Sequence, residues 1–153
     1  MTDLFEILRN KEPTGADILF QDSIIKLRSE AIELATNLKK FLSYKNLNIV
    51  TTESVTSGLI GSTLTDVGTA GSVLYGSFIV YDTDAKRKWL DVTTPNLYNT
   101  ETATQMAEKS LDKSRAMVAL SITGNATPFK NSKDCVGIAD IALSIRLKGG
   151  GFK

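Results

Sequence analysis

The stretch that decides the fold is "NIVTTESVTSGLIGSTLTD", residues 48–66. It begins as an apolar-leaning strand, breaks into small hydroxyl residues, and then continues with helical spacing. A strand that passes through a short turn into a helix is the building unit of α/β proteins. Ligands of such folds bind beyond the carboxyl ends of the strands. Ser54 and Thr56 stand at this turn, so we expect a site there.

Two interpretations of Ser54 follow from its position. A hydroxyl just before a helix commonly accepts hydrogen bonds from the first backbone N–H groups, as an N-cap. The same N–H groups can instead hold a phosphate, or an oxyanion that develops beside a serine nucleophile. Spacing alone favours the cap, and both interpretations stay open at this point.

The rest of the chain alternates between helical and strand-like patterns. We expect helices at 23–42, 57–67, 83–92 and 101–113, and strands at 47–54, 71–82, 116–124 and 136–145. The predicted fold is a three-layer α/β/α sandwich around a central sheet. Residues 23–153 form this domain, and residues 1–22 are an N-terminal extension.

The first predicted helix carries an apolar stripe with steps of three and four residues. Its members are Ile24, Leu27, Ala31, Leu34, Leu38 and Phe41. Because the stripe covers fewer than three heptads, it favours a helix that packs on its own domain over a coiled coil.

The composition excludes several classes of function. Histidine is absent, so a Ser-His-Asp triad, a Cys-His pair and a His-based metal site are impossible within the chain. We expect neither a metal nor a cofactor. The net charge is +1 with scattered Lys and Arg, which offers no argument for a nucleic-acid partner.

No segment approaches the roughly 20 apolar residues of a membrane helix, so we expect no membrane partner. The first residues, "MTDLFEILRNKEP", are interrupted by charges and do not form a signal peptide. A single cysteine suits a reducing compartment. The predicted location is the cytoplasm.

Lys86 is the second candidate for chemistry. It begins the helix after the second predicted strand, five residues after Tyr81. An isolated lysine is usually solvated. A partly desolvated lysine, however, can lose its proton near neutral pH and act as the base for a serine. In a chain without histidine this is one of the few ways to activate a serine.

Together these segments resemble the C-terminal domain family of the competence-damage-inducible protein CinA, whose stand-alone members include nicotinamide mononucleotide deamidases. "TTESVTSGLIGSTLTDV" (51–67) is similar to the family signature "AESCTGG…ltDv". "GSFIVYDTDAKRKWLDV" (76–92) is similar to the block "GFVTYSNEAK…LGV". "ALSITGNATP" (119–128) resembles "AVTGIAGP", and "VGIADIAL" (136–143) resembles the strand "PVGTVWIA". The resemblance covers about residues 24–145.

The resemblance implies a domain that hydrolyses the carboxamide of nicotinamide mononucleotide to the acid and releases ammonia. On this basis Ser54 is the nucleophile, Lys86 is the base that takes its proton, and Tyr81 supports the pair. Backbone N–H groups after Ser54 would stabilise the oxyanion. The implied substrate-binding residues are Glu53, Thr56, Gly58, Thr123, Gly124 and Asn125.

The chain departs from the family pattern at Val55 and Ser57, which replace a Cys and a Gly, and in "GNATP" (124–128). Two classes of function therefore stay open. One is a serine-dependent amidohydrolase acting on nicotinamide mononucleotide or a related small amide. The other is a catalytically inactive family member with a structural or assembly role.

We also expect a homo-oligomer. The final helical region of the family has no counterpart after "GGGFK" (149–153), so apolar surface should be exposed and covered by a partner. A larger assembly formed through residues 1–22 is a further expectation.

Overall fold

The computed structural model describes residues 15–68, 73–126 and 136–153. One sheet contains four strands in the order β2-β1-β3-β4. The strands are β1 (Ile49–Glu53), β2 (Leu74–Ile79), β3 (Val118–Gly124) and β4 (Ala139–Ile145). β1 pairs in parallel with β2 and with β3, and β4 runs antiparallel to β3. The carboxyl ends of the first three strands therefore meet at one edge of the sheet.

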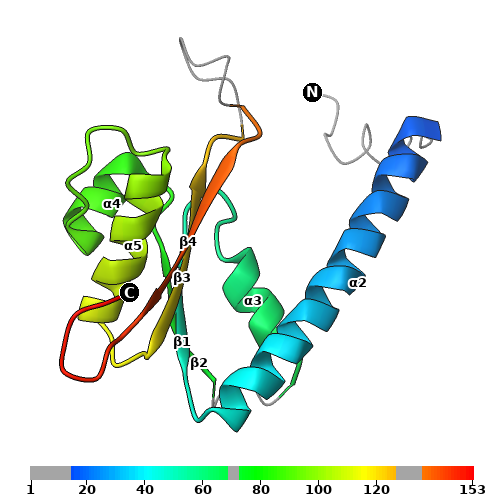
Figure 1. The fold of residues 1–153 in the computed structure, drawn as a ribbon. Helices are drawn as coiled ribbons and strands as arrows, with labels where there is room; N and C mark the ends of the chain where they lie inside the picture. The colour runs from blue at the N-terminus through cyan, green and yellow to red at the C-terminus, as the bar shows by residue number, and fades with distance from the viewer. Residues whose placement is uncertain (1–14, 69–72, 127–135) are drawn as a thin grey trace, which may run out of the picture.

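Helices cover both faces of this sheet (Figure 1). On one side lie α2 (Gly15–Tyr44) and α3 (Leu59–Asp66), and on the other lie α4 (Thr83–Leu90) and α5 (Thr100–Asp112). The three-layer α/β/α architecture predicted from the sequence is confirmed. Within the described ranges, no helix combines the length and the apolar character that a membrane span requires.

Strand β1 is the centre of the core. All five of its residues are buried, although neighbouring side chains on a strand point to opposite faces. Ile49 packs with Leu42 and Leu64 in the cluster under α2 and α3, whereas Val50 packs with Leu111 of α5. Because β1 is covered on both faces, Ser54, the residue that follows its carboxyl end, is also buried.

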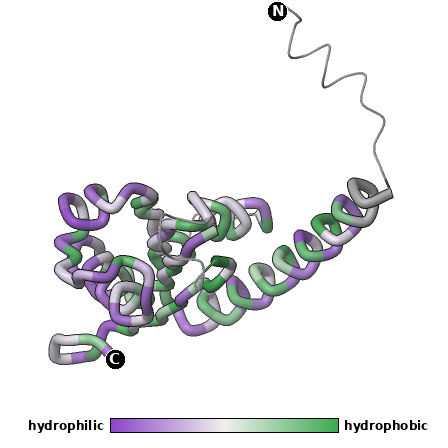
Figure 2. Tube along the Cα trace, turned by 90° about the horizontal axis from the view of Figure 1, so that it is seen from above, coloured by the Kyte–Doolittle hydropathy of each residue, from purple (hydrophilic) through white to green (hydrophobic). Residues whose placement is uncertain are grey.

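Helix α2 is longer than expected and only its carboxyl-terminal half packs on the domain. It begins at Gly15 rather than residue 23. Ala35 and Leu42 are buried, but all residues from 20 to 34 are exposed. In two perpendicular views this outer half leaves the domain (Figures 1 and 2). The prediction that the apolar stripe packs on its own domain is therefore wrong for its members Ile24, Leu27, Ala31, Leu34 and Phe41, which are exposed.

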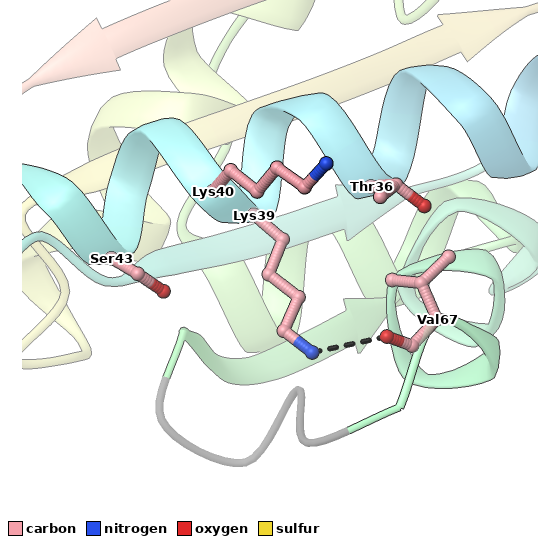
Figure 3. A pocket seen from close by; sticks show the side chains of 5 residues that line it. All are labelled: Thr36, Lys39, Lys40, Ser43 and Val67. Atoms are coloured by element: carbon pink, nitrogen blue, oxygen red, sulfur yellow. Dashed lines mark hydrogen bonds between the residues drawn. The ribbon is translucent and has the colours of Figure 1, made fainter.

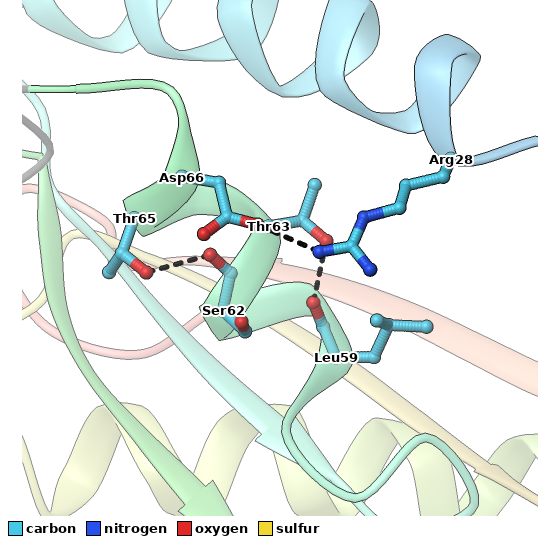
Figure 4. Close-up of polar contacts among 6 residues, drawn as sticks. All are labelled: Arg28, Leu59, Ser62, Thr63, Thr65 and Asp66. Atoms are coloured by element: carbon cyan, nitrogen blue, oxygen red, sulfur yellow. Dashed lines mark hydrogen bonds and ion pairs between the residues drawn. The ribbon is translucent and has the colours of Figure 1, made fainter. Parts of the chain in front are cut away.

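Polar contacts join α2 to the end of α3. A hollow of about 440 Å³ between the two helices is lined by Thr36, Lys39, Lys40, Ser43 and Val67 (Figure 3). The Lys39 amine donates a hydrogen bond to the Val67 carbonyl at 3.0 Å. Farther out, the Arg28 guanidinium lies 3.5 Å from the Asp66 carboxylate (Figure 4).

Candidate functional site

The turn after β1 is organised by the carboxylate of Glu53. This side chain is fully buried. Its oxygens accept hydrogen bonds from the amides of Gly58, Ile60 and Gly61 and from the hydroxyls of Thr51 and Thr56. The first N–H groups of a helix lack partners within the helix and favour negative charge. A buried carboxylate thus caps α3 from the side of the sheet.

Ser54 does not cap the helix. The N-cap position of α3 is Gly58, with φ 98°, which as a glycine has no side chain to accept a capping hydrogen bond. Ser54 is buried, with only 3% of its surface exposed, and its amide donates to the Ile122 carbonyl at 3.0 Å. The capping interpretation of Ser54 is therefore wrong, which leaves its hydroxyl available for another role.

Three predicted substrate-binding residues belong to the network that shapes the turn. The carboxylate of Glu53 accepts a hydrogen bond from the Thr56 hydroxyl at 2.8 Å and from the Gly58 amide at 3.1 Å. The donors of Thr56 and Gly58 and the acceptor oxygens of Glu53 are thus paired with one another, and these hydrogen bonds fix the conformation of the turn. The contact of these residues with a substrate stays a prediction.

The backbone of the turn is unusual at Ser57. This residue has φ 50°, a left-handed conformation that costs a non-glycine residue about 1–2 kcal/mol. It occupies the position where the resembling family has glycine. Gly58 follows at φ 98°, so two consecutive residues of the turn have positive φ.

Two backbone amides in this turn have no acceptor among the described residues. The amides of Ser54 and Ser57 donate to backbone carbonyls, and that of Gly58 donates to Glu53. No hydrogen bond of the described chain uses the amide of Val55 or of Thr56. These two donors directly follow Ser54, so the turn offers a pair of N–H groups beside a serine hydroxyl.

A pocket of about 300 Å³ opens at the carboxyl edge of the sheet. Its lining consists of Ser54, Val55, Tyr81, Asp82, Thr83, Tyr98, Gly124, Asn125 and Ala126. Segments that follow β1, β2 and β3 meet in it, as parallel strands require. Four predicted site residues are brought together here: Ser54, Tyr81, Gly124 and Asn125.

Five lining residues lie outside the predicted set: Asp82, Thr83 and Tyr98, together with Val55 and Ala126, which adjoin Ser54 and Asn125. The first two follow Tyr81 directly, so proximity in sequence could have indicated them. Tyr98 comes from the connection between α4 and α5, and no spacing pattern links it to the turn. Its position depends on a long-range contact, since the buried Thr123 hydroxyl donates to the Leu97 carbonyl at 2.9 Å. Thr123 thus holds the segment that carries Tyr98, and its predicted contact with a substrate remains to be tested.

Lys86 is fully buried in the first half of α4. Its amine donates to the Tyr81 carbonyl at 3.3 Å and lies 5.6 Å from the centre of the Tyr98 ring. Burial lowers the pKa of Lys86 below its ordinary value of 10.5, and the nearby Asp82 carboxylate partly offsets this effect. The interpretation of Lys86 as a solvated lysine is wrong.

The hydrogen bonds of the described residues include none between the Lys86 amine and the Ser54 hydroxyl. The amine instead lies against the backbone of Tyr81, whose side chain is 69% exposed and lines the pocket. The described ranges also contain no group of three or more Cys, Asp or Glu side chains arranged to hold a metal ion.

Comparison with known proteins places this chain in a family. The sequence profile of the CinA C-terminal domain matches residues 31–149. The chain belongs to the CinA C-terminal domain family. A CinA-like protein from Chloroherpeton thalassium is 32% identical over 120 residues, which are 71% of this chain and 29% of that protein. A CinA-like protein from Chlorobium phaeobacteroides is 31% identical over 150 residues, or 94% of this chain and 36% of that protein.

This CinA-family chain therefore spans about a third of the length of those curated relatives. Solved structures agree with the fold. A competence/damage inducible protein from Agrobacterium tumefaciens superposes with a TM-score of 0.69 at 33% identity, covering 80% of this chain and 77% of that one. A competence or damage-inducible protein from Enterobacter asburiae gives a TM-score of 0.72 at 25% identity, with 80% and 79% coverage.

Proposed function

We propose that this CinA-family chain is a serine-dependent amidohydrolase. It would convert the carboxamide of nicotinamide mononucleotide, or of a related small amide, to the acid and ammonia. The observation that carries the proposal is the position of Ser54, which lines a pocket beside two backbone amides without acceptors among the described residues. A fully buried lysine, Lys86, lies in α4, the helix that follows the neighbouring strand β2.

The first step is proton transfer from the Ser54 hydroxyl to the neutral amine of Lys86. Burial favours the neutral form of this lysine at lower pH than in water. The amine must turn from the Tyr81 carbonyl, its hydrogen-bond acceptor in the structure, toward Ser54. A lysine stem with four rotatable bonds permits this movement, and a 3.3 Å hydrogen bond to a carbonyl is not a strong restraint.

The second step forms a bond between Ser54 Oγ and the carboxamide carbon. The carbonyl oxygen becomes an oxyanion, and the amides of Val55 and Thr56 are the proposed donors to it. Each such donor is worth roughly 3–4 kcal/mol of barrier. The carbon–nitrogen bond then breaks, the nitrogen takes the proton held by Lys86, and ammonia leaves. Water attacks the acyl-serine, Lys86 takes a proton from the water, and Ser54 Oγ recovers that proton as the acid is released.

The lining of the pocket suits a cationic aromatic amide. Tyr81 and Tyr98 supply ring surfaces, and a pyridinium ring is attracted to the face of an aromatic side chain. Asp82 adds a negative charge at the same pocket. At about 300 Å³ the pocket lies at the small end of ligand sites, so we propose that it takes the ring and carboxamide of the substrate and not the whole nucleotide.

The test is release of ammonia from nicotinamide mononucleotide by the wild type and by matched variants. Ser54→Ala and Lys86→Ala should each lower the rate by more than about a thousandfold, because nucleophile and base act as a unit. Lys88→Ala is the control, since Lys88 is an exposed lysine of the same helix that pairs with Asp84. Equal ammonia release from all four proteins would disprove the mechanism.

The alternative function is a catalytically inactive member with a structural or assembly role. The observation that favours it is the outer half of α2, which exposes apolar side chains that the domain does not use. A folded wild-type protein that releases no ammonia from nicotinamide mononucleotide or nicotinamide, and that forms a stable assembly, would favour this alternative.

For either function we propose a cytoplasmic location, because a chain with one cysteine forms no internal disulfide and requires no oxidising compartment.

A further inference from the structure

The outer half of α2, residues 20–34, packs little against the domain to which it is attached. Every residue in this segment is exposed. An ion pair between Arg28 and Asp66 ties it to α3 at 3.5 Å, but both side chains are largely in water, where such pairs contribute little. A helix of this length has little stability in water unless an apolar face is packed. The segment therefore requires a partner surface.

Six of the exposed apolar side chains of α2 fall on one heptad seam, whereas Ile25, Ile32 and Tyr44 are exposed outside it. We define the α2 seam as Phe20, Ile24, Leu27, Ala31, Leu34 and Phe41. Phe20, Leu27, Leu34 and Phe41 are spaced by seven residues and are 67%, 59%, 70% and 54% exposed. Figure 2 shows that hydrophobic positions recur along α2 as it leaves the domain. Leu38 continues the seam seven residues after Ala31, but it packs on the domain together with Ala35 and Leu42, so the seam is free of the domain over residues 20–34.

We propose that α2 forms a parallel two-stranded coiled coil with α2 of a second copy of this chain. A repeat of seven residues is the pattern that another helix matches, because it keeps the seam facing the partner. An identical helix presents the same seam, and a two-fold symmetric contact uses the same patch on both copies. Ile24 at one core position with Leu27 and Leu34 at the other is the combination that favours two strands.

The charges beside the seam fit this pairing. Ile24 and Ala31 occupy one kind of core position in the heptad. In a parallel pair, the residue just before such a position lies opposite the residue five places later on the partner helix. Glu30 then faces Ala35 of the second copy, and Arg28 faces Ser23 of the second copy. Neither flank brings like charges together. An antiparallel pair centred on the same seam would instead place Glu30 near Glu30 and Arg28 near Arg28, which repel.

The area of the seam is sufficient for a reversible dimer. Its five large side chains are about half to two-thirds exposed. At ~150–200 Å² for each complete side chain, pairing would bury on the order of 500 Å² of apolar surface per copy, or about 1,000 Å² in total. That total meets the lower limit of a specific interface, so the dimer should form at micromolar concentrations and dissociate on dilution.

The first experiment measures the mass in solution by sedimentation velocity at micromolar concentrations. The wild type should have twice the chain mass of 16.6 kDa, and the double variant Leu27→Glu/Leu34→Glu should have the single chain mass. Two controls should remain dimeric: Ser29→Lys, on the opposite side of α2, and Leu143→Lys, on the exposed face of β4. A monomeric wild type would overturn the proposal, as would a dimer that is lost in Leu143→Lys but kept in Leu27→Glu/Leu34→Glu.

The second experiment tests the parallel register. In a Cys135→Ser background, Ala31→Cys places a thiol at a core position that faces itself across a parallel pair. Mild oxidation should crosslink this variant into a disulfide-linked dimer, whereas Ser29→Cys in the same background should stay monomeric on denaturing gels. A seam-dependent dimer that crosslinks no better at position 31 than at position 29 would overturn the parallel pairing.

Discussion

The carboxylate of Glu53 lies 2.8 Å from the backbone amide of Gly61, so the last residue of β1 closes the first turn of α3 inside the domain. Two further amides of the same turn donate to this side chain. The strand, the turn that carries Ser54 and the following helix are thereby held as one unit. The candidate nucleophile gains its fixed position from the residue before it.

Replacing the Glu53 carboxylate should therefore destabilise the domain. Glu53→Gln keeps the shape but puts an NH₂ group where backbone N–H donors require an acceptor, and it removes the charge that α3 favours. We expect the free energy of unfolding to fall by about 2–3 kcal/mol. Urea unfolding measures this change. Glu33→Gln, an exposed change on α2, should stay within about 0.5 kcal/mol, and an equal effect of both changes would contradict this role of Glu53.

Two adjacent threonines of β1 should respond in opposite ways to the same substitution. Thr51 and Thr52 are both fully buried. The Thr51 hydroxyl contacts Glu53 at 3.0 Å and Ser77 at 2.7 Å, whereas the Thr52 hydroxyl has no hydrogen-bond partner among the described residues. Thr51→Val should lower the free energy of unfolding by about 1–2 kcal/mol, and Thr52→Val should leave it unchanged or raise it by about 1 kcal/mol. Similar losses from both variants in urea unfolding would count against this assignment.

A side chain at Gly61 should not fit between α3 and the sheet. A Cβ atom added there would lie 2.3 Å from Ser77 Oγ and 3.3 Å from Thr51 Oγ1. Gly61→Ala should reduce the free energy of unfolding by about 1–3 kcal/mol, because a close-packed interface cannot absorb the extra atom without strain. Gly76→Ala is the matched control, since nothing lies within 4 Å of its added Cβ. Thermal unfolding measures the change. An unchanged midpoint in Gly61→Ala would contradict the prediction, because it would show that α3 can move away from the sheet at no cost in stability.

The buried Lys86 should make stability depend on alkaline pH. Its pKa in the folded protein lies below 10.5 because of burial. Between that lowered pKa and 10.5 the unfolded chain binds more protons at this site than the folded chain, so the contribution of Lys86 to stability rises with pH. Below the lowered pKa the buried Lys86 amine is charged, and burying this charge reduces the stability of the folded protein by its full amount.

Urea unfolding of wild type and Lys86→Met at neutral pH and near pH 10 isolates this contribution, because other groups titrate in both proteins. The wild type should gain stability relative to Lys86→Met as the pH rises across the window. A difference between the two proteins that stays constant with pH, or that changes in the opposite direction, would show that Lys86 keeps its ordinary pKa when folded.

Local sequence patterns determined most of the fold and the position of Ser54. Strand and helix periodicities arise from which side chains lie on the buried face of each element, and this is a property of neighbouring residues. The order of elements then requires a layered sheet whose strand ends converge, which brings Ser54, Tyr81 and Gly124 to one pocket. The absence of histidine limits the chemistry through composition alone, because no arrangement of this chain can supply an imidazole.

Only the tertiary structure decided which polar groups are satisfied and which faces are covered. Glu53 caps α3 and Lys86 is buried because distant segments close over them, and Tyr98 reaches the pocket through the contact of Thr123 with Leu97. The stripe on α2 has the same period whether it meets its own domain or another helix. The direction in which α2 leaves the domain decides between the two, and that direction is set by packing around Leu42, far from the residues it leaves exposed.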